Sequence, residues 1–252
     1  MNSINNIYRK AVKIIRESII TLDLDLANKV VLTEVGSGNY CYTPLIPLLA
    51  GADRVYAWTR DSAYGKAQDI MNRCYDLAKK LNCNTRLTIS DVKNLDHVAE
   101  ADIITNSGFI RPIDSTFLRS VKLDVAIPLM YEAWEIREHD IDISYCKKNG
   151  IKVAGTWEGH PELQVFKNVG PLCIKLCMEA GFEIFCNRII VWSNDHFGEE
   201  AEKAFNALNA QNVIVTTEVA EVYKNAADTD FIFICDYDEK RNYFHGEDAV
   251  FS

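Results

Sequence analysis

The sequence has no run of 18 uncharged apolar residues and no stretch in which lysine and arginine gather. A membrane-spanning helix needs about 20 consecutive apolar residues, so we expect no membrane anchor. The 252 residues include 36 acidic and 27 basic side chains, giving a formal net charge of −9, so the attraction that drives nucleic-acid binding is missing. The amino terminus also lacks the apolar segment of a secretory signal. We therefore expect a cytoplasmic protein that binds neither nucleic acid nor membranes.

The eight cysteines include no Cys-x-x-Cys pair, which argues against the common zinc and dithiol motifs. Cys173 and Cys177 are four residues apart, but no histidine or second cysteine pair accompanies them at zinc spacing. In a reducing compartment, we expect most cysteines to be small buried apolar residues. We predict no metal site.

Hydrophobic residues make up 48% and charged residues 25% of the chain, which is the ordinary globular balance. Apolar residues recur at three- and four-residue spacing over residues 4–20, which predicts an amphipathic opening helix; they are Ile4, Ile7, Tyr8, Val12, Ile15, Ile19 and Ile20. After it, helical stretches alternate with short β-rich runs at 29–34, 54–58, 85–89, 102–105, 123–128, 151–155, 188–193, 212–216 and 231–236. This alternation predicts an α/β fold of two Rossmann-like modules, each a parallel sheet flanked by helices.

We place the boundary between the modules after residue 128, from the order of the elements alone, because no linker marks it. Residues 1–128 then form a flavodoxin- or Rossmann-like domain, and residues 129–252 form a second, smaller Rossmann-like domain. The apolar helix predicted over residues 163–180 packs either within the chain or against a second copy, so a homodimer is an open alternative.

The most informative motif is the apolar strand that runs into Gly36-Ser37-Gly38. Glycines in such a turn let the backbone approach a phosphate closely, and a following helix offers free N–H groups to an anion. The third glycine of the dinucleotide motif is absent, and Pro44 and Pro47 interrupt the helix that would follow. The alternative is that the glycines only shape a tight turn.

Some twenty residues further on, the second strand ends at Arg60-Asp61-Ser62, where such folds place a ribose-recognising group. Asp61 is positioned to accept hydrogen bonds from ribose hydroxyls. Arg60 and Ser62 are positioned to meet a 2′-phosphate. Together with Gly36, Ser37 and Gly38, these residues form a candidate cofactor site for NAD or NADP.

Two further clusters follow strand ends. Glu132, Trp134 and Arg137 place opposite charges beside an aromatic ring, which invites a substrate-binding role in a cleft between the modules. A solvated hinge with surface ion pairs explains the same residues. Glu158 and His160 form a candidate acid/base pair, because a carboxylate orients a histidine that titrates near neutrality. A simple turn before the next helix is the alternative.

In the second module, the loop from Ser193 to Gly198 stands where a dinucleotide loop belongs. Ser193 and Asp195 replace the early glycines, and Asp195 puts negative charge where a pyrophosphate would lie. A normal dinucleotide is therefore not expected there.

From about residue 101 to 236, the order of elements resembles the D-2-hydroxyacid dehydrogenase family. The likeness lies in residues 101–108, 118–127, 140–142 and 149–154. It implies a flavodoxin-like domain followed by an NAD-binding Rossmann domain. The glycine-rich loop of that family is replaced here by residues 193–198, and no residue matches its catalytic Arg, Glu and His. The Gly36 turn also resembles, over about thirty residues, the opening of S-adenosylmethionine-dependent methyltransferases.

Three hypotheses follow. The first is an NAD(P)-dependent oxidoreductase-like protein that binds a nucleotide and a small metabolite in the interdomain cleft. The second is a non-catalytic Rossmann-fold ligand-binding or scaffold protein, and the third is a methyltransferase-like enzyme that uses S-adenosylmethionine.

Overall fold

The computed structural model describes residues 2–236, 241–244 and 246–251, with side chains from residue 8 onward. The chain divides into two units, Met1–Trp157 and Glu158–Ser252. The division falls 29 residues after the one predicted from the sequence. The physical reason is that the strand expected to open the second module instead pairs in parallel with the last strand of the first sheet.

Unit 1 is built on a six-stranded parallel sheet in the order β3-β2-β1-β4-β5-β6. This is the order of the dinucleotide-binding Rossmann fold, whereas flavodoxin-like sheets run 2-1-3-4-5. The α/β class is therefore confirmed, and of the two types expected for the first domain the sheet has the Rossmann order. The strands are β1 (Val30–Glu34), β2 (Arg54–Trp58), β3 (Leu87–Ser90), β4 (Ile103–Ile104), β5 (Ala126–Pro128) and β6 (Lys152–Ala154).

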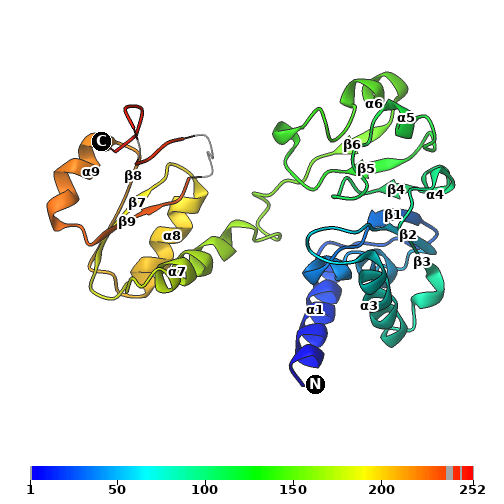
Figure 1. The fold of residues 1–252 in the computed structure, drawn as a ribbon, viewed down its shortest axis with the longest axis horizontal. Helices are drawn as coiled ribbons and strands as arrows, with labels where there is room; N and C mark the ends of the chain where they lie inside the picture. Colours follow the sequence, from blue (N-terminus) through cyan, green and yellow to red (C-terminus); the bar gives the residue numbers. More distant parts are fainter. Residues whose placement is uncertain (1, 237–240, 245, 252) are drawn as a thin grey trace. The chain divides into compact units, whose positions relative to one another are not determined.

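Helices cover both faces of this sheet, as Figure 1 shows for unit 1. Alternation along β1 directs Val31 to one face and Leu32 to the other, and both side chains are buried. The first face packs against α1 (Asn2–Thr21), α2 (Leu45–Leu49) and α3 (Ala67–Lys80), and the second against α4 (Leu95–Glu100), α5 (Ser115–Leu118) and α6 (Ile143–Asn149). Short 3₁₀ segments lie at η1 (Gly38–Tyr42), η2 (Asn84–Arg86) and η3 (Ala133–Glu135).

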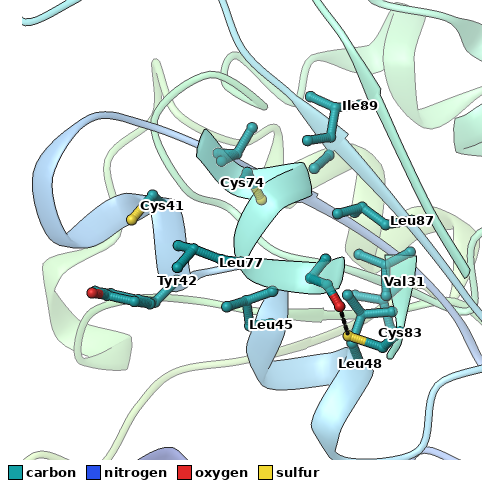
Figure 2. Close-up of a cluster of buried hydrophobic side chains, with 14 of the residues drawn as sticks. Val31, Cys41, Tyr42, Leu45, Leu48, Cys74, Leu77, Cys83, Leu87 and Ile89 are labelled. Carbon is teal, nitrogen blue, oxygen red and sulfur yellow. Dashed lines mark hydrogen bonds between the residues drawn. The ribbon is translucent and has the colours of Figure 1, made fainter. Parts of the chain in front are cut away.

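Cysteines pack as apolar residues in the core on the first face (Figure 2). Cys41, Cys74 and Cys83 are buried there, and the Cys83 thiol donates a hydrogen bond to the carbonyl of Ala78 at 3.4 Å. Burial raises the pKa of Cys74 to about 12, so this thiol stays protonated and unreactive at neutral pH. All eight cysteines lie in the described part of the chain, and six of them are buried, as the sequence predicted for most of them.

Unit 2 contains a three-stranded parallel sheet in the order β8-β7-β9. Its strands are β7 (Arg188–Trp192), β8 (Asn212–Thr216) and β9 (Phe231–Ile234). One face packs against α7 (Val169–Glu179) and α8 (His196–Ala207), and the other against α9 (Val219–Asn225). Two 3₁₀ segments, η4 (Phe166–Asn168) and η5 (Ala226–Asp228), precede α7 and follow α9.

The apolar helix predicted over residues 163–180 begins later than expected, at Val169. Gln164 has a φ of +53°, which lies outside the right-handed helical region, so no helix extends through it. Among the described residues, no helix is long and apolar enough to cross a bilayer.

His97 forms part of the packing between β2 and α4 on the second face. Its ring stacks on Tyr56 with centroids 3.9 Å apart, and its Nδ1 accepts a hydrogen bond from the Trp58 indole N–H at 3.1 Å. Burial lowers the pKa of His97, against the opposing effect of Glu100 and Asp96. The folded state therefore favours neutral His97.

We expect the stability of unit 1 to depend on pH through His97. Because the pKa is lower in the folded state than in the unfolded state, the unfolded chain binds more protons below the ordinary histidine pKa of about 6.5. The contribution is fully present above that pH and is lost as the pH falls through the folded pKa. Urea unfolding followed by tryptophan fluorescence from pH 7.5 to 5 measures it.

The variant His97→Gln should flatten this part of the pH profile, whereas His196→Gln, which changes a histidine of unit 2 paired with Glu199, should leave it unchanged. If the unfolding free energy of His97→Gln depends on pH as steeply as that of wild type, His97 does not cause this pH dependence.

Candidate functional site

The carboxyl ends of the parallel strands of unit 1 all lie at one edge of the sheet. The side of β1 on which successive strands are added changes after β3: β2 and β3 lie on one side of β1, and β4, β5 and β6 lie on the other. The parallel strands β1 and β4 are therefore neighbours in the sheet although β2 and β3 separate them in sequence. In open α/β sheets, ligands bind outside the carboxyl ends at such a switch point. The Gly36-Ser37-Gly38 turn leaves β1 at this position.

Both glycines of the turn are required by its geometry. Gly36 is buried, and a Cβ added there would lie 2.9 Å from the Cβ of Tyr40. Gly38 has a φ of +59°, in the left-handed region, with open space around it. The backbone N–H groups of Ser37 and Gly38 donate to no acceptor among the described residues, and they lie at the surface. They are available to an anion.

The element after the turn differs from the helix of a standard dinucleotide site. The chain forms η1 and then the five-residue α2, with Pro44 at its N-cap and Pro47 inside it. The predicted interruption by the two prolines is confirmed. Consequently the N–H groups of the turn itself, rather than a long helix dipole, are what this site offers to a phosphate.

Arg60 follows β2 and lies beside the switch point. Its guanidinium lies over the ring of Phe109, 5.2 Å from the ring centroid, and Phe109 belongs to the loop after β4. No salt bridge or hydrogen bond of the Arg60 guanidinium is found within the part of the chain that the structure describes. An exposed, unpaired and stacked guanidinium is a favourable partner for a phosphate.

Asp61, in contrast, is engaged by its own loop. Its Oδ1 accepts the N–H of Ala67 at 2.9 Å, and its Oδ2 accepts from the Lys66 ammonium at 2.7 Å. These two hydrogen bonds lower the pKa of Asp61. From the sequence, we expected Asp61 to accept hydrogen bonds from ribose hydroxyls. In the structure, Asp61 closes the turn that leads into α3. A ribose contact remains a prediction.

Lys93 adds a second positive charge near Arg60. Its ammonium donates to the carbonyls of Ile110 and Arg111 at 2.9 and 3.0 Å, which ties the loop after β3 to the loop after β4. Burial lowers the pKa of Lys93, and the Arg60 charge lowers it further against the opposing effect of Asp114. Two positive charges, those of Arg60 and Lys93, therefore lie near each other at the carboxyl edge beside β2.

The structure adds two buried residues that the sequence pattern did not single out. Glu34, the last residue of β1, accepts the N–H of Phe109 at 2.8 Å and fixes the loop after β4. Asn106 is 1% exposed; its Oδ1 accepts the N–H of Met130 at 2.7 Å, while its Nδ2 has no partner among the described residues. The signal that could have found them is a polar residue at the end of an apolar strand.

A mostly buried ion pair holds two of these loops together. Arg111 follows β4, and its Nη1 lies 2.6 Å from Oδ2 of Asp140, which follows β5. The Tyr131 hydroxyl donates to the same Oδ2 at 3.4 Å. Burial, and then the Asp140 charge, raise the pKa of Tyr131, so this hydroxyl remains a donor at neutral pH.

The predicted substrate cluster lies entirely in unit 1. Glu132 is the N-cap of η3 and forms a capping box with Glu135, which explains its local role. The Arg137 guanidinium lies 4.9 Å from the Tyr131 ring centroid, and Trp134 is 71% exposed. The role of these three residues in substrate binding stays a prediction.

Glu158 and His160 lie in the turns that open unit 2. Nδ1 of His160 accepts the N–H of Glu162 at 3.3 Å, and the N–H of Leu163 donates to the His160 carbonyl. These hydrogen bonds shape the turn before η4. The acid/base role of Glu158 and His160 likewise stays a prediction.

In the loop from Ser193 to Gly198, side chains accept hydrogen bonds from N–H groups at the start of α8. Asp195 caps α8 by accepting the N–H of Phe197 at 2.9 Å, and the Ser193 hydroxyl accepts the N–H of Gly198 at 3.1 Å. A Cβ on Gly198 would lie 2.6 Å from the Ser193 Cβ, so the loop is closely packed. The N–H groups of Phe197 and Gly198 therefore already have acceptors within this loop.

No group of three or more His, Cys, Asp or Glu side chains suited to a metal ion is found in the residues that the structure describes. The candidate site is therefore made of backbone N–H groups, Arg60 and neighbouring polar side chains at the carboxyl edge of unit 1.

The strand order and the position of the glycine turn define unit 1 as a Rossmann-type α/β unit. No protein-family model matches the chain, and no curated protein does. Its fold is similar to that of a dipicolinate synthase subunit from Bacillus halodurans, with a TM-score of 0.54 and 13% identity over 83% of this chain and 75% of that chain. At this level of identity, the likeness shows the fold alone.

Two other solved structures have lower similarity. A dipicolinate synthase from Bacillus subtilis has a TM-score of 0.47 and 13% identity, over 84% of this chain and 68% of that chain. Shikimate 5-dehydrogenase from Listeria monocytogenes, solved with shikimate and NAD, has a TM-score of 0.40 and 11% identity, over 59% of this chain and 54% of that chain. The resemblance to D-2-hydroxyacid dehydrogenases is not confirmed.

Proposed function

We propose that the chain is an NAD(P)-dependent oxidoreductase-like protein whose unit 1 binds a pyridine dinucleotide, preferentially NADP(H), at the carboxyl edge of its sheet. The observation that carries the proposal is the unpaired Arg60 guanidinium beside the Gly36-Ser37-Gly38 turn at the switch point. In this architecture, the group after the second strand distinguishes the two dinucleotides, and an arginine accommodates the 2′-phosphate.

Three features of the turn support the location. The N–H groups of Ser37 and Gly38 lie at the surface and have no acceptor among the described residues, so they are free to donate to pyrophosphate oxygens. A Cβ built on Gly65 would lie 3.6 Å from the Ser37 Cβ, which places the loop after β2 directly against the turn. A Cβ built on Gly38 would meet no atom within 4 Å, so the turn is uncovered at that residue.

The geometry of the second loop supports unit 1 over unit 2 as the nucleotide site. Asp195 and Ser193 already accept the N–H groups of Phe197 and Gly198 in the first turn of α8, and Asp195 adds a negative charge there. Hydride transfer to a small metabolite is the reaction class that a pyridine dinucleotide would serve. The proposed acid/base pair for it is Glu158 and His160, with Glu132, Trp134 and Arg137 as proposed substrate contacts.

Thermal unfolding of the intact chain with NADPH, NADH, S-adenosylmethionine and S-adenosylhomocysteine tests the proposal. A ligand at 100 times its dissociation constant stabilises the folded state by about 2.7 kcal/mol. We expect the largest rise in Tm with NADPH, a smaller rise with NADH, and none with the two methionine derivatives. A rise only with S-adenosylmethionine would favour the methyltransferase alternative, and no rise with any of the four would favour a scaffold.

A further inference from the structure

A cavity in unit 1 differs from the proposed nucleotide site in position and chemistry. Its volume is about 730 Å³, within the range of roughly 300–1,000 Å³ typical of small-molecule sites. It lies on the first face of the sheet, and Gly36, Ser37 and Gly38 are not among its lining residues. The lining comes from β1, β4, β5 and β6, from α2 and from the segment that follows α1.

The walls of this cavity are almost entirely aliphatic. They are formed by Leu24, Leu26, Val31, Ile46, Pro47, Ile103, Ala126, Ile127, Pro128, Ile151, Val153 and Ala154. Such a surface favours an apolar ligand body, since burying apolar area is worth about 25 cal/mol per Å². A flat phosphate-bearing nucleotide would find few hydrogen-bond partners there.

Among the described residues that line the cavity, one is charged, Lys152 on β6. The ammonium of Lys152 has no ion pair or hydrogen bond within the described part of the chain, and the residue is exposed. An unpaired cation at the edge of an apolar cavity is complementary to a ligand with one anionic group.

Hydroxyl groups stand at the other end of the cavity. Thr33 and Thr105 line it, their hydroxyl oxygens lie 2.9 Å apart, and Thr105 makes a second contact of 2.9 Å with the Ser107 hydroxyl. Lys152 on β6 is three strands away from Thr33 on β1, roughly 14 Å at the usual strand spacing of about 4.8 Å. The cavity therefore suits an elongated apolar molecule with its charge at the β6 end.

We propose that this cavity binds an amphipathic monocarboxylate, with its carboxylate on Lys152 and its alkyl body across β5 and β4. The charge complementarity of Lys152 and the aliphatic walls favour this occupant over a neutral lipid or a second copy of the chain. The inference is independent of the nucleotide site, because the two sites share no residue.

Titration calorimetry of the intact chain with decanoate, and with decanol as the neutral control, tests this proposal. We expect decanoate to bind more tightly than decanol. Lys152→Met should lower decanoate affinity about tenfold and leave decanol affinity unchanged, because only the carboxylate loses its charged partner. Lys148→Met, which removes an exposed charge of α6, is the matched control and should change neither.

Ala126→Leu should weaken both ligands by filling the cavity. If Ala126→Leu does not fold, Lys152→Met alone tests the proposal, because the Lys152 side chain is exposed. Equal decanoate affinity in wild type and Lys152→Met, or no decanoate binding, would overturn the proposal. So would a dimer in sedimentation that Ile46→Asp converts to monomer, since a second copy would then fill the cavity.

Discussion

Replacing Arg60 with glutamine should lower the affinity for NADPH by about 10- to 100-fold and leave the affinity for NADH nearly unchanged. A hydrogen bond to a charged group contributes about 1.5–3 kcal/mol, and each 1.4 kcal/mol changes a dissociation constant tenfold. Only NADPH carries the 2′-phosphate that Arg60 is proposed to bind. Fluorescence titration of the reduced nucleotides, at fixed ionic strength, measures both constants.

The matched control for this change is Arg73→Gln, which removes an exposed arginine of α3. It alters the net charge equally, so any general electrostatic effect of losing one positive charge will be seen in both variants. A parallel loss of NADPH affinity in both, or an equal loss of NADPH and NADH affinity in Arg60→Gln, would contradict a specific 2′-phosphate contact.

Removing the Arg111 guanidinium should cost unit 1 about 3 kcal/mol of unfolding free energy, because breaking one partner of a buried ion pair typically costs about 3–5 kcal/mol. In Arg111→Met, the partners that the Asp140 carboxylate keeps among the described residues are the Tyr131 hydroxyl and the exposed His139. The Asp140 side chain is 7% exposed, so water does not replace the lost guanidinium. Differential scanning calorimetry should show a fall in Tm of roughly 6–12 °C.

Two further variants isolate the ion pair as the cause. Arg119→Met removes an exposed arginine of the same unit and should change Tm by less than about 1–2 °C. The double variant Arg111→Met with Asp140→Leu removes both charges, and we expect it to be more stable than Arg111→Met alone. If Arg111→Met and Arg119→Met unfold at the same temperature, the pair does not hold the loops.

The sequence predicts the strands of this fold well because each is a short apolar run between turn residues. The predicted ranges 54–58 and 212–216 coincide with β2 and β8. The sequence predicts less well to which of the two sheets each strand belongs. The run at 151–155 follows a helix and a glycine C-cap, as the first strand of a new module would, and only its pairing with β5 places it in unit 1.

The site shows the same limit. The glycine turn was predictable, because glycine readily adopts the positive φ that a tight turn after a strand requires, as Gly38 does here. The different environments of Arg60 and Asp61 were not predictable, although the two residues are adjacent in sequence. Their roles depend on Phe109, which is 49 residues from Arg60, and on Lys66 and Ala67 in the following turn. Contacts between loops of different strands leave no periodic pattern.

The most direct test of the central claim is a crystal structure of the intact chain with NADPH. We predict electron density for the pyrophosphate within hydrogen-bond distance of the Ser37 and Gly38 N–H groups, with the 2′-phosphate on the Arg60 guanidinium. Density for the nucleotide at the Ser193 loop, or a turn at Gly36 that stays free at saturating NADPH, would contradict the account.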